Sequence, residues 1–211
     1  MATIPVDLRY TRDHEWAKPD AVGYFRYFGT LAGPSGRGYY AFDAGSWRVY
    51  ALAGDCWAVG GCRMGSPQHG WLAADLAAHP AACVLAVWHQ PRFSSGPHGS
   101  STATRPLLKL LYDAGAELVV NGHDHDYERF APARPDGTAD PAHGIRQIVA
   151  GTGGAPLYPF RKTLAPNSEV RDNEHKGVLQ LTLDVDAYAW EFLPVKPGFT
   201  DSGSGACHGE P

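Results

Sequence analysis

The sequence predicts an α/β fold in which helices alternate with the strands of mixed sheets. Two segments carry this prediction: the unbroken apolar run at residues 83–88 is typical of a strand buried on both faces, and residues 104–114 have a helical pattern that Gly115 ends. Composition agrees, because 44% apolar residues can form a core while 25 Gly and 17 Pro indicate many loops.

The first predicted elements are a hairpin and a helix. Residues 38–43 and 47–53 are predicted strands, separated by the turn signal Ala44-Gly45-Ser46. Ser66 and Pro67 predict the start of a helix, since serine caps helices and proline suits their first turn. The dipeptide His79-Pro80 predicts its end.

Strands dominate the rest of the chain. The remaining predicted elements are a strand at 83–88, a helix at 104–114, and strands at 117–120, 145–150, 178–185 and 188–195. The last two are expected to pair antiparallel. The Gly/Ser-rich segment 197–211 is expected to be a loosely held tail.

Length and charge exclude several classes of protein. The 211 residues suit one domain, residues 1–211. The 18 basic and 22 acidic side chains leave a net charge of −4, which argues against nucleic acid or an anionic membrane as a partner. No stretch approaches the roughly 20 apolar residues of a membrane span. Residues 1–20 lack the pattern of a signal peptide.

The cysteines allow two interpretations. Cys56 and Cys62 flank a Gly-bearing segment that could fold back and join the two sulfurs, and a spacing of five intervening residues is not typical of zinc sites. They form either a short-loop disulfide, which would indicate an oxidising compartment, or two reduced thiols. Cys83 opens the apolar run and is expected to be a small buried residue.

Three histidines follow the ends of predicted strands. His89 comes directly after residues 83–88, and His123 and His125 follow residues 117–120. Because the carboxyl ends of neighbouring strands meet at one crevice, the three imidazoles are expected to converge. An extended backbone would put His123 and His125 on one side, whereas a turn between them would let each ring serve a different metal ion.

Other assignments of the histidines stay open. His89 before a proline also fits an ordinary capped loop residue. His98, in the Gly/Ser loop after His89, could reach a substrate. Five others are expected on exposed segments with no special role: His69, His79, His143, His175 and His208.

Several motifs together resemble a known family. Residues 121–129, Asn-Gly-His-Asp-His-Asp-Tyr-Glu-Arg, resemble the G-H-x-H-x-Y-E-R signature of purple-acid-phosphatase-like proteins in the calcineurin-like metallophosphoesterase superfamily. Residues 88–96 resemble the preceding family motif, and residues 12–15 occupy the position of its Gly-Asn-His-Glu motif. The resemblance covers about residues 12–208 and implies an α-β-β-α sandwich with mixed sheets.

The resemblance also implies roles for individual residues. His89 and His123 match ligands of the family's second metal ion, and His125 matches a ligand of the first. Asp13 replaces an asparagine ligand, and His14 matches a catalytic histidine near the leaving group. The implied cofactors are Fe, Zn or Mn ions, two in the complete family site and one or none here; the implied partner is a small phosphorylated substrate.

Two family motifs have no counterpart before Asp13. The Asp-x-His and Gly-Asp-x-x-Tyr motifs should precede it, but only twelve residues do, with Asp7 as their one acid. Residues 54–57 imitate the second motif in the wrong order and are interpreted as structural. We therefore expect a catalytic domain that lacks its N-terminal strands, with residues 1–11 as an atypical leader.

Two functions follow from these motifs. The first is hydrolysis of phosphate esters by metal-activated water, weak in this shortened chain because a bridging carboxylate is missing. The second is a remnant without activity, serving as a binding module or a structural metal site. An extracellular location is expected for a complete protein of this kind, and the oligomeric state is left open.

Overall fold

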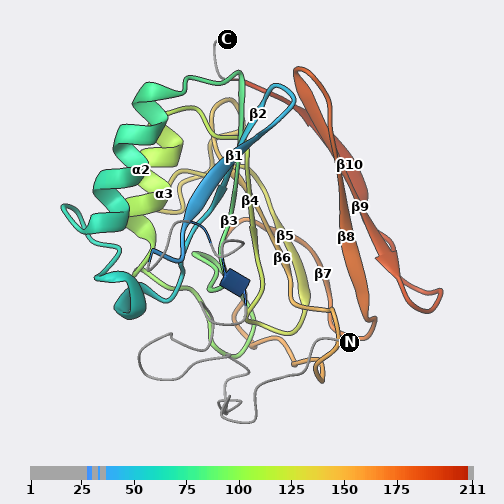
Figure 1. Ribbon diagram of the computed structural model, residues 1–211. Coiled ribbons are helices and arrows are strands. Elements are labelled where there is room, and N and C mark those ends of the chain that lie inside the picture. The colour runs from blue at the N-terminus through green and yellow to red at the C-terminus, as the bar shows by residue number, and fades with distance from the viewer. Residues whose placement is uncertain (1–27, 30–32, 34–36, 209–211) are drawn as a thin grey trace.

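A computed structural model describes residues 28, 29, 33 and 37–208. Two helices cover one face of a seven-stranded sheet, and a three-stranded sheet packs on the other face (Figure 1). These three layers of the described residues agree with the predicted α/β class and its mixed sheets.

The large sheet is mixed and runs in the order β1-β2-β3-β4-β6-β5-β7. Its central pairs β2–β3, β3–β4 and β4–β6 are parallel, whereas β1–β2, β5–β6 and β5–β7 are antiparallel. Its strands are β1 (Tyr40–Ala44), β2 (Trp47–Ala51), β3 (Cys83–Val87), β4 (Leu118–Asn121), β5 (Tyr127–Phe130), β6 (Arg146–Ala150) and β7 (Ser168–Asp172).

The small sheet is antiparallel and includes part of the predicted tail. It consists of β8 (Gly177–Leu183), β9 (Ala187–Pro194) and β10 (Ser202–Ala206), in the order β10-β9-β8. The antiparallel pairing of the two strands predicted at 178–185 and 188–195 is confirmed by β8 and β9. The expectation of a loose tail is wrong for β10, because its backbone pairs with β9 despite its Gly/Ser sequence.

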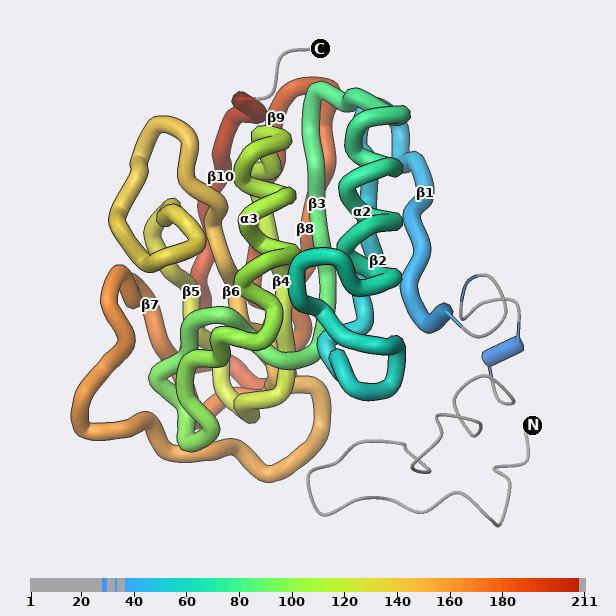
Figure 2. Tube along the Cα trace, turned by 90° about the vertical axis from the view of Figure 1, so that its left-hand side faces the viewer, coloured from blue at the N-terminus to red at the C-terminus, as the bar shows by residue number. Residues whose placement is uncertain are grey.

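The helices α2 (Pro67–Ala78) and α3 (Arg105–Asp113) lie side by side in front of the parallel strands (Figure 2). The side chain of Ser66 caps α2 by accepting a hydrogen bond from the backbone of His69, as the sequence predicts. After α3, Gly115 has a φ of 76°, which suits glycine and lets the chain leave the helix.

Apolar side chains fill both spaces between the layers. Leu107, Leu108 and Leu111 of α3 are buried against the large sheet. Between the sheets, Trp47 and Tyr127 pack with Phe192 of β9, and all three are at most 1% exposed. Fully burying a side chain of this size contributes about 1.5–3 kcal/mol, so both layers depend on these contacts.

A buried carboxylate ties the two sheets together. Asp201, which precedes β10, accepts hydrogen bonds from the Tyr127 hydroxyl (2.7 Å), the Arg129 guanidinium (2.7 Å) and the Trp190 indole (3.2 Å). Burial opposes the ionisation of Asp201, but the hydrogen bonds from Arg129 and Tyr127 outweigh it and hold its pKa below the usual value.

Two disulfides are present among the described residues. Cys56 and Cys62 form a disulfide, which is the first of the two interpretations of these cysteines. Cys83 is joined to Cys207, so the expectation that Cys83 is simply a small buried residue is wrong. The two partners are 124 positions apart, and only the packing of β10 beside the start of β3 brings them together.

The sequence patterns missed β5 and β7. Both strands are rich in charged side chains, with Glu128 and Arg129 in β5 and Glu169 and Arg171 in β7. These charges are satisfied by partners across the sheet, for example Arg129 by Glu169 and Asp201, so the strands are stable without an apolar run.

Candidate active site

The ends of two parallel strands bring His89 and His123 together. β3 leads through Trp88 to His89, and β4 leads through Gly122 to His123. The backbone N–H of Gly122 donates to the carbonyl of His89 (3.0 Å), which ties the two loops to each other. His123 Nδ1 then lies 3.1 Å from His89 Nε2, so two imidazole nitrogens face one another.

The backbone turns sharply at His123. Its φ is 71°, in the left-handed region that residues other than glycine rarely adopt. In the same turn, the backbone N–H of Asp124 donates to the carbonyl of Gly122 (2.9 Å). Such a conformation costs on the order of 1–3 kcal/mol. The turn aims the ring of His123 toward His89 and lets His125 take a different direction.

His125 is held on its other side by a carbonyl and an aromatic ring. Its Nδ1 lies 2.9 Å from the carbonyl of Pro156, and its ring stacks on Tyr158 with centroids 4.1 Å apart. A carbonyl oxygen only accepts, so Nδ1 carries the proton and the neutral ring has its lone pair on Nε2. Histidines that bind metals are commonly oriented by such a hydrogen bond.

His98 joins the cluster from the loop after β3. Its ring centroid lies 4.3 Å from that of His123 and 5.6 Å from that of Tyr158. The loop and the end of β4 border an open cavity of about 390 Å³. The cavity is lined by Gln90, Pro91, His98, Gly99, Ser100, Ser101, Thr102 and His123.

The position of His98 depends on Asp124, a residue that the sequence patterns did not single out. Asp124 is fully buried, and one of its oxygens, Oδ1, faces both the backbone N–H of His98 (3.1 Å) and its Nδ1 (2.7 Å). The other oxygen accepts a hydrogen bond from the Ser94 hydroxyl. Acidic residues stand at every second position after His123, at 124, 126 and 128. This pattern is the one signal in the sequence that could have indicated the role of Asp124.

Two further buried acids follow Asp124 on alternate positions. Glu128 accepts hydrogen bonds from the backbone N–H (2.7 Å) and hydroxyl (2.5 Å) of Ser95, which anchors the loop that carries His98. The side-chain carboxyl group of Asp126 is buried, and neither of its oxygens has a hydrogen-bond partner among the described residues. Burial and the charges of Asp124 and Glu128 raise the pKa of Asp126 to about 8.

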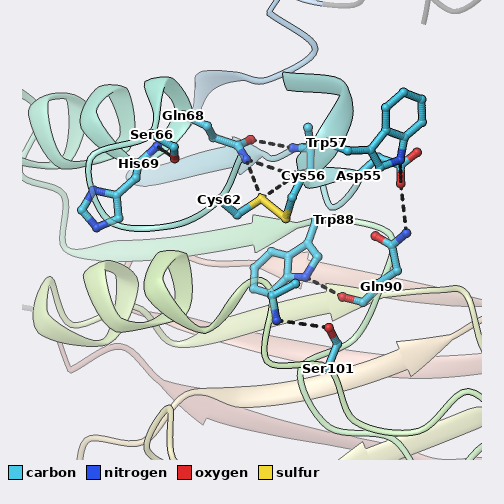
Figure 3. Close-up of a disulfide and its surroundings, with 12 residues drawn as sticks. Asp55, Cys56, Trp57, Cys62, Ser66, Gln68, His69, Trp88, Gln90 and Ser101 are labelled. Atoms are coloured by element: carbon cyan, nitrogen blue, oxygen red, sulfur yellow. Dashed lines mark hydrogen bonds between the residues drawn. A yellow bond between two sulfur atoms is a disulfide. The ribbon is translucent and has the colours of Figure 1, made fainter. Parts of the chain in front are cut away.

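The disulfide loop brings a carboxylate to the same edge. Asp55 Oδ1 accepts hydrogen bonds from Gln90 Nε2 (3.4 Å) and Trp57 Nε1 (3.2 Å), next to the Cys56–Cys62 disulfide (Figure 3). A Cβ on Gly54 would lie 3.2 Å from the backbone nitrogen of His89, so glycine makes this close approach easier. Residues 54–57, interpreted as merely structural, thus border the histidines.

The surroundings of His89 favour its neutral form. Burial lowers the pKa of His89 below its usual value, and the nearby rings of His125 and His98 lower it further. The carboxylate of Asp55 has the opposite effect without reversing the direction. A neutral imidazole has a lone pair, which is what binding to a metal ion requires.

The described histidines have the donor chemistry of a metal centre but do not complete one. His89 and His123 present facing nitrogens, and His125 has its lone pair on Nε2. Nevertheless, within residues 28, 29, 33 and 37–208 no group of three or more His, Cys, Asp or Glu side chains is arranged to hold a metal ion. Asp13 and His14, the other residues predicted for the site, lie outside the described residues.

Comparison with solved structures identifies the fold. A purple acid phosphatase from yellow lupin (Lupinus luteus) seeds superimposes with a TM-score of 0.76 at 20% identity, over 88% of this chain and 35% of the lupin chain. GAP50, described as the anchor in the inner membrane complex of Plasmodium, superimposes with a TM-score of 0.56 at 16% identity, over 82% of this chain and 54% of that protein. The chain has the metallophosphoesterase fold.

Sequence comparison also finds purple acid phosphatases among the relatives of this chain. Purple acid phosphatase 21 of Arabidopsis thaliana is 35% identical over 117 residues, which are 51% of this chain and 26% of that protein. Purple acid phosphatase 22 of the same plant is 31% identical over 148 residues, which are 64% of this chain and 32% of that protein. The uncharacterized protein Rv2577 of Mycobacterium tuberculosis is 34% identical over 126 residues, which are 53% of this chain and 24% of that protein. No family model matches the chain.

These findings confirm the resemblance that the motifs indicated. The chain is similar to purple acid phosphatases in sequence and has the fold of the lupin enzyme. It spans about a quarter to a third of the length of the two Arabidopsis relatives. No helix of the described residues is both long and apolar enough to cross a membrane.

Proposed function

We propose that this chain is part of a metal-dependent phosphoesterase that hydrolyses small phosphate esters with water. The observation that carries the proposal is the pair of facing nitrogens, His123 Nδ1 and His89 Nε2, which are 3.1 Å apart, with His123 lining the cavity. One of the two nitrogens donates to the other, and when the donor ring carries its proton on its other nitrogen, both present lone pairs to a cation. The similarity to purple acid phosphatases supports this assignment.

Three of the histidines would bind metal, and others would act on the substrate. His89, His123 and His125 would hold Fe, Zn or Mn, with Asp13 as a further ligand. When bound, such ions neutralise the charge of a phosphate ester and lower the pKa of a coordinated water molecule. His98 would bind the substrate phosphate from the cavity wall, and His14 would assist departure of the alcohol.

The two disulfides favour an extracellular location. Cysteine pairs persist in oxidising compartments and are rare in the cytosol. We include the whole chain, residues 1–211, in one incomplete catalytic domain. Its partners would be small phosphorylated molecules, with no role for nucleic acid or membranes, in keeping with a net charge of −4.

Metal binding gives the first test. The purified chain is stripped with a chelator, titrated with Zn²⁺ or Mn²⁺ in a calorimeter and checked by elemental analysis. We expect binding that His123→Ala weakens at least about 10-fold, in the range found when metal sites lose supporting groups. His79→Ala is the matched control, because His79 lies on the exposed end of α2 and contacts Asp75. Equal loss in both variants, or no bound metal, would reject the proposed site.

Hydrolysis gives the second test. The metal-loaded chain is assayed with an aryl phosphate monoester and an aryl phosphate diester. We expect slow turnover that disappears with a chelator and in His123→Ala. Metal binding without any turnover would instead favour a remnant that serves as a binding module or a structural metal site.

A further inference from the structure

We infer that Asp124 is a positioning residue that fixes the proton of His98 on Nδ1 and thereby presents Nε2 to the cavity. The inference deepens the proposed phosphoesterase function and rests on it for its consequence. Its geometric part, which nitrogen of His98 carries the proton, stands on the structure alone.

The contacts of Asp124 leave little freedom for His98. The same oxygen, Oδ1, accepts from the backbone N–H of His98 (3.1 Å) and faces its Nδ1 (2.7 Å). These two contacts hold both the backbone of His98 and its imidazole ring in place. Because Asp124 is fully buried while the side chain of His98 is 38% exposed, the carboxylate is the fixed partner of the pair.

The loop is built to allow this contact. A Cβ added to Gly96 would lie 2.6 Å from the Cβ of Asp124, a separation that real side chains do not reach. Only glycine lets residues 94–98 fold so closely around the carboxylate. Ser94 supports the same arrangement, since its hydroxyl donates to Asp124 and accepts from the backbone N–H of Gly96 (2.9 Å).

The serine in this group is not an activated nucleophile. A nucleophilic serine is commonly activated by donating to a histidine or another general base, whereas Ser94 donates to the carboxylate that holds His98. His98 is therefore left to act on a substrate directly. With its proton fixed on Nδ1, the neutral ring offers a lone pair at Nε2 beside His123, and the charged ring offers an N–H there to a phosphate oxygen.

The direct test is the protonated nitrogen of His98, read by NMR in a chain with isotope-labelled histidine. The spectra are recorded at about pH 8, a condition that favours neutral imidazole in general. We expect the Nδ1–H form in the unmodified chain and in Asp124→Asn, whose amide oxygen still accepts, and the Nε2–H form in Asp124→Ala. Asp113→Asn, on the exposed face of α3, is the control.

Two results would overturn the inference. One is an Nε2–H form of His98 in the unmodified chain, which needs no variant to fold. The other is an Nδ1–H form that persists in folded Asp124→Ala, because Asp124 would then only support the loop.

The consequence for function is tested separately. If the metal-loaded chain turns over an aryl phosphate, Asp124→Ala should lower kcat about 10-fold or more with a smaller change in KM, since a positioned acid–base group contributes about 10²–10⁴-fold. In a His98→Ala background the same change should have no further effect; an undiminished effect there would show that Asp124 does not act through His98. Without turnover, the proposed function fails in this chain while the NMR result still decides the inference.

Discussion

Cys83 and Cys207 join the first residue of β3 to the residue that follows β10, so one covalent bond connects the large sheet to the small one. The bond closes a loop of 124 positions, which contains every described strand after β2. The second disulfide, between Cys56 and Cys62, closes a loop of only six positions beside the cavity. The two bonds therefore differ in what they stabilise.

Removing the long-range disulfide should destabilise the whole domain. A cross-link that closes a longer loop restricts the unfolded chain more, and its loss typically costs about 2–5 kcal/mol. We expect Cys83→Ser with Cys207→Ser to lower the free energy of unfolding by this amount, measured by urea denaturation without reductant. Cys56→Ser with Cys62→Ser is the comparison, and an equal or larger loss there would contradict the prediction.

Gly96→Ala should push the His98 loop away from Asp124. The added methyl group would overlap the carboxylate, so we expect a loss of about 1–3 kcal/mol of stability, as for other overpacked sites. The His98 Nδ1–H signal should weaken in the same variant. Gly153→Ala is the matched control, because its added Cβ would meet nothing within 4 Å. A Gly96→Ala chain with unchanged stability would mean that the loop does not pack on Asp124.

Because the backbone at His123 is strained, we expect the usual order of stability between glycine and alanine variants to be reversed there. At a φ of 71°, glycine is relaxed while alanine is strained by roughly 1–2 kcal/mol. We therefore expect His123→Gly to be more stable than His123→Ala by about 1 kcal/mol in urea denaturation. At His125, where φ is not positive, the alanine variant should be the more stable of the pair.

The stability of the contact between the sheets should depend on pH through Asp201. Its folded pKa lies below the unfolded value of about 3.9, so its stabilisation is present above that value and is lost as the pH falls through the folded pKa. We expect Asp201→Asn to cost about 1–3 kcal/mol near neutral pH and less in acid, because its charged hydrogen bonds are lost. Asp186→Asn, at an exposed turn, should leave the pH dependence unchanged.

Much of the fold could be predicted from local patterns. The apolar run at 83–88, the serine cap of α2 and the glycine after α3 each act within a few residues, and the structure places β3, α2 and α3 there. The signature at residues 121–129 also indicated the family resemblance. Boundaries differ by one or two residues; β4, for example, is Leu118–Asn121 rather than residues 117–120.

The sequence by itself determined the α/β class, the order of its main elements and the histidines that follow β3 and β4, because hydrophobic periodicity, caps and short motifs are local properties. Tertiary structure alone decided the Cys83–Cys207 bond, the pairing of β10 and the contact between Asp124 and His98. The physical reason is that Cys83 meets Cys207, and Asp124 meets His98, only after the chain has folded, while the Gly/Ser sequence of β10 has no strand pattern of its own. A polar residue such as Asp124 shows its role only once burial has removed water and left His98 and Ser94 as its partners.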